Sequence, residues 1–185
     1  MPKNKEGKAV PAATFKIYEK TFPQTISTTD LFSHKTVVFF AVPGAFTQPY
    51  SPIQVLGYNE YADTFSANGV DDIICLSVNG PFALARWAKE EKADRIRFIP
   101  DVKGDFTRGM GMLIDLSEKG MGQRSRRYSM LVKNGLIEKM FIEQRSLGAF
   151  PTVSSAETMM NYINPAAQKP KRVTALMQIW TAVLS

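Results

Sequence analysis

Apolar positions along this chain follow two patterns that alternate. Continuous apolar runs at Val37–Val42 and Ile73–Val78 are typical of strands buried on both faces of a sheet, and Ile96–Ile99, halted by Pro100, predicts a third strand. Between the first two runs, one apolar stripe at helical spacing is formed by Val55, Tyr58, Ala62 and Phe65. The pattern therefore predicts strands that alternate with helices.

Turn residues mark where these elements end. Asn68–Gly69 predicts the C-terminal end of the first helix. Asn79–Pro81 interrupts the chain and predicts the start of a second helix, whose inner face carries Leu84, Trp87 and Ala88. Helices placed between consecutive strands are the order of an α/β fold.

The last third of the chain predicts a hairpin and a helix. Asn134–Gly135 separates Tyr128–Val132 from Leu136–Ile142, and this dipeptide supplies the positive φ angles of a type I′ turn. Ser154 followed by Glu157 forms a capping box, and the helix predicted after it carries Met159, Met160, Tyr162 and Ile163. The complete order predicts an α/β protein whose helices cover a largely buried sheet.

The composition is that of one globular domain. The chain has 185 residues, of which 44% are hydrophobic and 22% are charged. Its net charge is +6, and basic residues gather in the N-terminal tail, around Arg124–Arg127 and at Lys169–Arg172. Because no nucleic-acid-binding motif accompanies them, we interpret these residues as a solvated basic surface and expect no nucleic-acid partner.

The sequence contains a single cysteine, Cys75, and a single histidine, His34. The chain therefore cannot form an internal disulfide, and we expect no metal site, no cofactor and a surface position for His34. No apolar run is long enough to cross a bilayer, and the N-terminus does not resemble a signal peptide. We therefore expect a cytoplasmic protein.

The segment of greatest chemical interest follows the strand at Val37–Val42. A helix that begins directly after a buried strand presents unpaired backbone N–H groups and the positive end of its dipole. A cysteine in that first turn has a lowered pKa and becomes a good nucleophile. Pro43 and Thr47 reproduce the peroxiredoxin spacing Pro-x-x-x-Thr-x-x-Cys, but Tyr50 stands at the position of the cysteine.

Four segments in the same order resemble the type-five peroxiredoxins, and above all the bacterial members that are often fused to a glutaredoxin domain. These segments are Pro43–Thr47, Cys75–Asn79, Gly109–Met112 and Arg127–Met130. The resemblance extends from about Gly7 to Asn164. It implies a thioredoxin-like fold with peroxiredoxin-type additions, a homodimer, and a thiol peroxidase in which Arg127 is the catalytic arginine.

The resemblance fails at the reactive residue. Relatives usually end this motif with Thr-Pro-Thr-Cys, whereas this chain has Thr47-Gln48-Pro49-Tyr50. A phenol stays protonated at neutral pH and has no step equivalent to oxidation of a thiolate to sulfenic acid. We therefore predict a homologue without peroxidase activity that acts as a binding or regulatory module. The alternative is a thiol peroxidase that reduces hydrogen peroxide or small alkyl hydroperoxides with glutathione or glutaredoxin as reductant.

Several candidate site residues keep more than one interpretation. Cys75 lies in mid-strand, where burial raises the pKa of a thiol, so we predict an inert core cysteine; the alternative is a slow thiol activity that compensates for Tyr50. Pro43 and Thr47 either keep catalytic roles or only shape and cap the start of the helix. Arg127 either pairs with a carboxylate, contacts Tyr50 through a cation–π interaction, or maintains an anion site, and we favour a structural role.

The predicted domain spans residues 1–165, and residues 166–185 form a separate tail. After the basic linker Lys169–Arg172, one helical stripe is formed by Val173, Leu176, Met177, Trp180, Val183 and Leu184. This stripe predicts a short amphipathic helix that docks on the domain or across a dimer. The alternative is a helix that binds a protein partner or a membrane surface.

Overall fold

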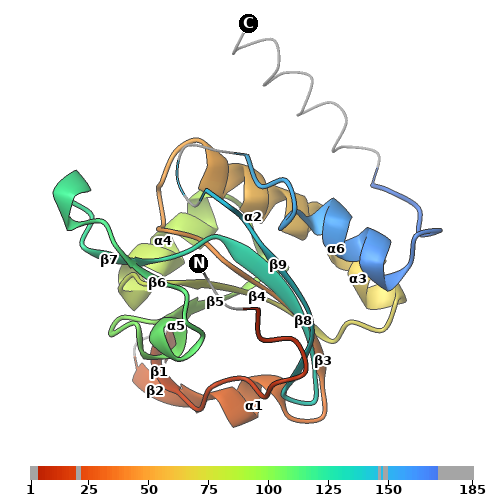
Figure 1. The fold of residues 1–185 in the computed structure, drawn as a ribbon, viewed down its shortest axis with the longest axis horizontal. Coiled ribbons are helices and arrows are strands. Elements are labelled where there is room, and N and C mark those ends of the chain that lie inside the picture. Colours follow the sequence, from red (N-terminus) through yellow and green to blue (C-terminus); the bar gives the residue numbers. More distant parts are fainter. Residues whose placement is uncertain (1–3, 20–21, 146, 148–149, 171–185) are drawn as a thin grey trace, which may run out of the picture.

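The computed structural model describes residues 4–19, 22–145, 147 and 150–170 (Figure 1). Its central five-stranded sheet has the order β5-β4-β3-β8-β9. The strands are β3 (Thr36–Ala41), β4 (Asp72–Ser77), β5 (Arg97–Pro100), β8 (Tyr128–Lys133) and β9 (Leu136–Ile142). β3 is parallel to β4 and antiparallel to β8, so the sheet is mixed. The three predicted strands and the predicted hairpin are confirmed.

Helices cover both faces of this sheet, as the alternating pattern predicts (Figure 1). One face carries α2 (Tyr50–Glu60), α3 (Ala62–Ala67), α4 (Pro81–Glu90) and α6 (Ala156–Ile163). The other face carries α1 (Thr28–Phe32) and α5 (Asp105–Gly109). This is the thioredoxin-like arrangement that the resemblance implies.

β3 holds these two layers together. Successive side chains of a strand point to opposite faces, so Val38 and Phe40 enter the cluster under α2 and α6, and Phe39 enters the cluster under α1 and α5. Phe40 stacks on Tyr58 of α2 with ring centroids 4.1 Å apart. The segment that leaves β3 toward Tyr50 therefore starts from a position fixed on both sides.

The first predicted helix is divided in two. α2 ends at Glu60 and α3 begins at Ala62, with Tyr61 at the boundary. The predicted apolar stripe still faces the core, and Tyr58 lies 6.0 Å from Phe65 between ring centroids. The stripe thus predicts the buried face correctly. The break between the two helices is not predicted, because no proline or glycine lies at Tyr61 to indicate it.

Two hairpins outside the central sheet are not predicted by the sequence pattern. β1 (Thr14–Glu19) pairs with β2 (Phe22–Ser27), and β6 (Leu113–Asp115) pairs with β7 (Gln123–Ser125). The first four residues of β2 are exposed, and β6 and β7 have 3 residues each. β1 alternates apolar Phe15 and Ile17 with polar Thr14 and Lys16 over a short stretch, whereas β2, β6 and β7 present no continuous or alternating apolar run by which strands are recognised.

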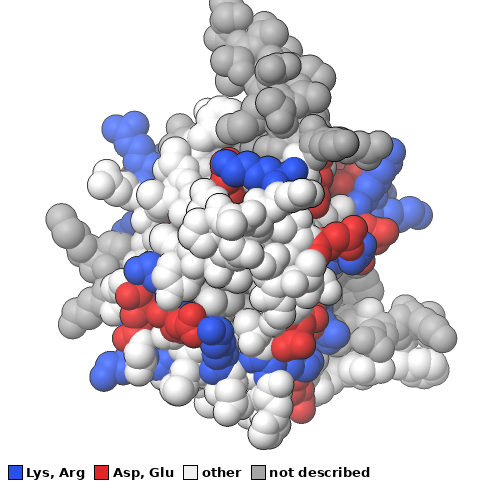
Figure 2. Space-filling model, turned by 90° about the vertical axis from the view of Figure 1, so that its right-hand side faces the viewer, with Lys and Arg blue, Asp and Glu red and all other residues white. Residues whose placement is uncertain are grey.

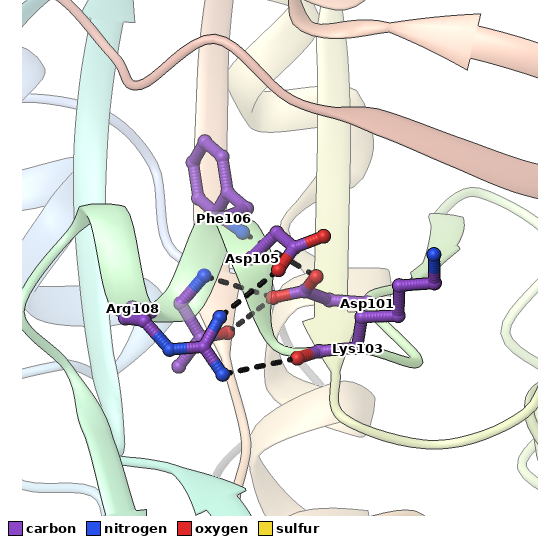
Figure 3. Close-up of polar contacts among 6 residues, drawn as sticks. Asp101, Lys103, Asp105, Phe106 and Arg108 are labelled. Atoms are coloured by element: carbon purple, nitrogen blue, oxygen red, sulfur yellow. Dashed lines mark hydrogen bonds and ion pairs between the residues drawn. The ribbon is translucent and has the colours of Figure 1, made fainter.

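α5 is also too short for a periodic pattern, and a buried carboxylate secures its first turn. Asp101 accepts hydrogen bonds from the N–H of Thr107 at 2.8 Å and from its hydroxyl at 2.6 Å (Figure 3). The N–H of Phe106 lies 3.4 Å from the same carboxylate. The carboxylate thereby satisfies backbone donors that the first turn of a helix leaves unpaired.

The β8–β9 hairpin has the predicted turn. Asn134 and Gly135 have φ angles of 47° and 77°, and Lys133 pairs with Leu136 across the turn. The Asn134 side chain also accepts a hydrogen bond from the N–H of His34 at 2.8 Å, which ties the hairpin to the loop before β3. His34 is exposed, as predicted.

The start of α6 corrects the predicted capping box. The N-cap residue is Ser155, whose hydroxyl accepts from the N–H of Thr158 at 3.1 Å. Ser154 is buried instead and donates its N–H and hydroxyl to Glu143 at 2.8 and 2.9 Å. A buried carboxylate needs hydrogen-bond donors. Because Ser154 supplies two of them to Glu143, Ser155 acts as the N-cap residue of α6 in its place.

The amphipathic stripe predicted after residue 172 lies outside the described residues, so the tail helix stays a prediction. Of the basic linker, Lys169 is described, and it forms an ion pair with Glu157 of α6. Among the described helices, none is long and apolar enough to cross a membrane.

Candidate functional site

The segment between β3 and α2 is a tight, partly buried turn. Pro43 and Gly44 are both buried. A Cβ atom at Gly44 would lie 2.8 Å from Thr47 Oγ1, a distance that side chains do not tolerate without a shift. The turn therefore holds the Thr47 hydroxyl close to Gly44, ahead of Tyr50, which is the first residue of α2.

α2 begins without a side-chain cap. Its N-cap residue is Pro49, which makes no capping hydrogen bond, and the N–H of Ser51 donates to the Thr47 carbonyl at 3.2 Å. Of the two alternatives for Thr47, capping of this helix by its side chain is not observed, because Thr47 contributes its main-chain oxygen. The Thr47 hydroxyl stays beside Gly44, within the turn.

Arg127 reaches the same end of α2 from the sheet. It directly precedes β8, and only 1% of it is exposed. Its Nη1 donates to Gln54 Oε1 at 2.5 Å and lies 3.5 Å from the Tyr50 carbonyl oxygen, and its Nη2 lies 3.4 Å from Ser51 Oγ. Burial lowers the pKa of Arg127 to about 10, and the carboxylate of Glu143 opposes this shift. The guanidinium is therefore charged at neutral pH and directed at the first turns of α2.

The Tyr50 ring packs on a residue of the loop before α6. It meets Phe150 edge-on, with ring centroids 5.1 Å apart. Among the described residues, the cation–π contacts are made by Lys139. A cation–π contact between Arg127 and Tyr50, one of the three alternatives for Arg127, is not among them, and Arg127 approaches Tyr50 at its main-chain carbonyl.

Sequence reasoning missed the polar network that positions Arg127. Gln54 Nε2 donates to the Ser154 carbonyl at 3.0 Å, and the Tyr58 hydroxyl donates to the same oxygen at 2.8 Å. Ser154 in turn donates to Glu143, so the network connects Arg127 through α2 to the loop before α6. Periodicity predicts that residues beside Val55 are buried, but it gives no signal for the partners of Gln54.

A second arginine lies beside the turn. Arg124 Nη1 donates to the Val78 carbonyl at 3.2 Å, and its Nε is buried without a hydrogen-bond partner among the described residues. Asn79 Oδ1 accepts from the N–H of Ala45 at 2.9 Å. A Cβ atom at Gly44 would lie 3.6 Å from Asn79 Oδ1 and 3.8 Å from Arg124 Nε, so both side chains border the turn.

Cys75 is separated from this surface. It lies opposite Phe40 of β3 in the sheet and has an exposed fraction of 0%. Burial raises the pKa of the thiol well above its usual value, although the charge of Arg127 acts in the opposite direction. The predicted burial of Cys75 is confirmed. Among the described residues, no group of His, Cys, Asp and Glu side chains is arranged to hold a metal ion.

Comparison with known proteins defines the class to which this site belongs. The redoxin family model matches residues 5–160, and the chain is therefore a member of the redoxin family. A hybrid peroxiredoxin of Haemophilus influenzae is 46% identical over 169 residues, which are 91% of this chain and 70% of that protein. A peroxiredoxin of Synechocystis is 46% identical over 144 residues, 76% of each chain. Within the redoxin family, the chain belongs to the peroxiredoxins.

Solved structures agree with this assignment. Reduced Prx3 from Vibrio vulnificus in complex with hydrogen peroxide has a TM-score of 0.80 and 35% identity, over 86% of this chain and 98% of that chain. The antioxidant protein of Plasmodium falciparum, a 1-Cys peroxiredoxin, has a TM-score of 0.79 and 30% identity, over 88% of this chain and 99% of that chain. The fold is that of a peroxiredoxin.

Proposed function

We propose that this peroxiredoxin has no thiol-peroxidase activity and acts as a non-catalytic binding or regulatory module. The observation that carries the proposal is the residue at the start of α2. The resemblance to type-five peroxiredoxins assigns the reactive cysteine to this position, and the residue there is Tyr50. The polar groups around it, Thr47 and Arg127, are present without a thiol to act on.

The chemistry of peroxide reduction explains why the substitution matters. A thiolate attacks one peroxide oxygen, the O–O bond breaks, the sulfur becomes a sulfenic acid, and the second oxygen leaves as water or an alcohol after protonation. A reductant then returns the sulfenic acid to the thiol. The side chain of Tyr50 offers no sulfur that can complete this cycle, so Thr47 and Arg127 have no nucleophile to assist.

The chain's own thiol is a poor substitute. Cys75 has no exposed surface, and burial raises its pKa, so both access of peroxide and the fraction of thiolate are reduced. A second candidate function nevertheless follows from the retained polar groups and from the relatives named as peroxiredoxins. It is a thiol peroxidase that works through Cys75 after local opening and uses glutathione or glutaredoxin as reductant.

Peroxide consumption by matched variants tests the proposal. We expect the wild-type chain to consume no hydrogen peroxide above a Cys75→Ser control, and to show no dimedone adduct on Cys75 by intact mass. We expect Tyr50→Cys to consume peroxide at least about a hundredfold faster than wild type, because a helix N-terminus and Arg127 favour a thiolate there.

The same assay would also reveal peroxidase activity through Cys75. If wild type consumes peroxide, loses that activity in Cys75→Ser, forms a dimedone adduct on Cys75, and in the absence of dimedone turns over repeatedly when glutathione is supplied, Cys75 has compensated for Tyr50 and the non-catalytic function is wrong. Because Cys75→Ser changes a buried side chain, its fold is first checked by circular dichroism against wild type.

We further propose that the protein is a homodimer. The support is a pair of large apolar side chains in contact on the surface, together with one further exposed aromatic residue. Phe82 of α4 is 69% exposed and packs with tilted rings against Tyr18 of β1, which is 40% exposed, at 4.7 Å between ring centroids. Phe46, in the turn before α2, is 43% exposed. Monomeric proteins rarely leave such a group uncovered.

A further inference from the structure

A basic pocket lies outside the site around Arg127. It has a volume of about 350 Å³ and is formed at the β6–β7 hairpin, and we call it the β6–β7 pocket. Its charged lining residues are Lys119, Arg126, Arg145 and Asp115, and its apolar lining includes Ile114 and Leu116. The lining therefore carries three positive charges, one negative charge and apolar side chains.

The three cations of this pocket are available to a ligand. Within the described part of the chain, the ion pairs join other residues, and none includes Lys119, Arg126 or Arg145. Arg108, in contrast, forms an ion pair with Asp105 at 2.9 Å. Figure 2 shows another face of the molecule, on which basic and acidic side chains stand beside each other.

The one carboxylate of the pocket is already engaged. Asp115 accepts hydrogen bonds from the hydroxyl of Ser117 at 2.5 Å and from its N–H at 2.8 Å. The Ser117 hydroxyl and N–H lower the pKa of Asp115, so this carboxylate is ionised and directed at the turn that contains Ser117. The pocket consequently keeps an excess of positive charge at neutral pH.

The chain path separates this pocket from the arginines of the site. Arg127 is buried and directed at Gln54, and Arg124 donates to the Val78 carbonyl. Arg126, between them, lines the β6–β7 pocket, and its N–H donates to the Met112 carbonyl at 2.8 Å. This main-chain bond holds Arg126 in position beside β6.

We propose that the β6–β7 pocket binds an acidic, amphipathic segment of a protein partner. The inference rests on the proposed function, since it names the partner of a non-catalytic binding module. Carboxylates of such a segment complement the three cations, and an apolar side chain between them packs on the half-buried Ile114 and Leu116. A nucleic acid instead requires a longer basic track and offers no aliphatic side chain for this floor.

Binding of a defined peptide tests this inference. The probe is a fluorescein-labelled peptide of repeated Glu-Glu-Leu units, and fluorescence anisotropy measures its affinity at low and high salt. We expect Arg126→Glu/Arg145→Glu to weaken binding at least about tenfold. The control Lys8→Glu/Lys103→Glu makes the same change in net charge on exposed lysines away from the pocket, and we expect less than about a twofold effect.

Three outcomes would overturn the inference. They are no binding of the peptide to wild type, equal weakening by the two double variants, and displacement of the peptide by a short oligothymidylate at comparable concentration. None of them depends on peroxide. Failure of the peptide assay therefore leaves the peroxide assay to decide the proposed function, and peroxide turnover by wild type would defeat the proposed function whatever the peptide does.

Discussion

At the scale of residues, the stability of this protein depends on how its buried polar groups are satisfied. Tyr58 and Tyr128 are both 0% exposed, and they differ in their partners. The Tyr58 hydroxyl donates to the Ser154 carbonyl at 2.8 Å, as part of the network that reaches Arg127. The Tyr128 hydroxyl is buried without a hydrogen-bond partner among the described residues. Comparing the two tyrosines therefore distinguishes the free-energy cost of burying a hydroxyl from the stabilisation that its hydrogen bond provides.

Removing each hydroxyl should have opposite consequences. Tyr58→Phe is expected to lower the free energy of unfolding by about 1 kcal/mol or more, because it leaves the buried Ser154 carbonyl with one donor fewer. Tyr128→Phe is expected to be neutral or to stabilise by up to about 1 kcal/mol, because it removes an unpaired polar atom. Urea denaturation of both variants measures the difference, and a greater loss in Tyr128→Phe would contradict it.

The same two tyrosines predict a loss of stability at alkaline pH. Burial raises the pKa of Tyr58 and of Tyr128 above that of an unfolded tyrosine. Above about pH 10 the unfolded chain releases protons that the native state retains, so stability falls as pH rises through that range and is fully present below it. The double variant Tyr58→Phe/Tyr128→Phe should show a shallower fall in unfolding free energy between about pH 9 and about pH 11. An unchanged slope would assign the alkaline loss to other groups.

At the scale of elements, the beginning of α6 shows how a buried charge decides where a helix starts. Glu143 is 5% exposed and lies between β9 and the loop that leads to α6. It takes two donors from Ser154, and Ser155 becomes the cap of the helix. Glu157, which the sequence pattern assigns to a capping box, pairs with Lys169 instead.

Three substitutions distinguish these roles. Ser155→Ala should cost about 1 kcal/mol as the loss of an N-cap. Ser154→Ala should cost about 1–3 kcal/mol, because a hydroxyl donor to the buried Glu143 carboxylate is lost. Glu157→Gln should cost less than about 1 kcal/mol, since its ion pair is on the surface. Thermal and urea denaturation give the order, and a cost for Glu157→Gln equal to that of Ser155→Ala would favour the original capping box.

At the scale of the whole molecule, the exposed aromatic side chains predict assembly. Phe82 and Tyr18 form a tilted aromatic pair on the surface, and burying that pair against a second copy would remove apolar area from water. Peroxiredoxin ancestry agrees with a homodimer, and a cytoplasmic location stays a prediction of the sequence.

Sedimentation velocity tests the assembly with one substitution and one control. The wild-type chain should sediment as a dimer, and Phe82→Glu should shift it to monomer, because a charge would be buried without a partner in the interface. Val153→Glu changes another exposed apolar residue, which is 43% exposed and lies just before α6, and should leave the dimer intact. A monomeric wild-type chain would show that the exposed aromatic pair has a different use.

The sequence by itself determined the central sheet, the helix faces and the turn of the hairpin, because each depends on local pattern. Val37–Val42 is apolar throughout and becomes the middle strand, and Asn134–Gly135 adopts the positive φ angles that its residue types favour. The burial of Cys75 follows from its strand in the same way. The motif at Pro43, Thr47 and Tyr50 could likewise be read from spacing alone.

Only the tertiary structure decided which polar groups meet. Arg127 bonds Gln54, and Glu143 takes Ser154 from the cap of α6, although 73 and 11 positions separate the two members of each pair. Such pairs depend on the distance between elements after packing, and no periodicity along the chain records that distance. The same reason explains why the β6–β7 pocket, built from three separate segments, was visible in the sequence only as scattered basic residues.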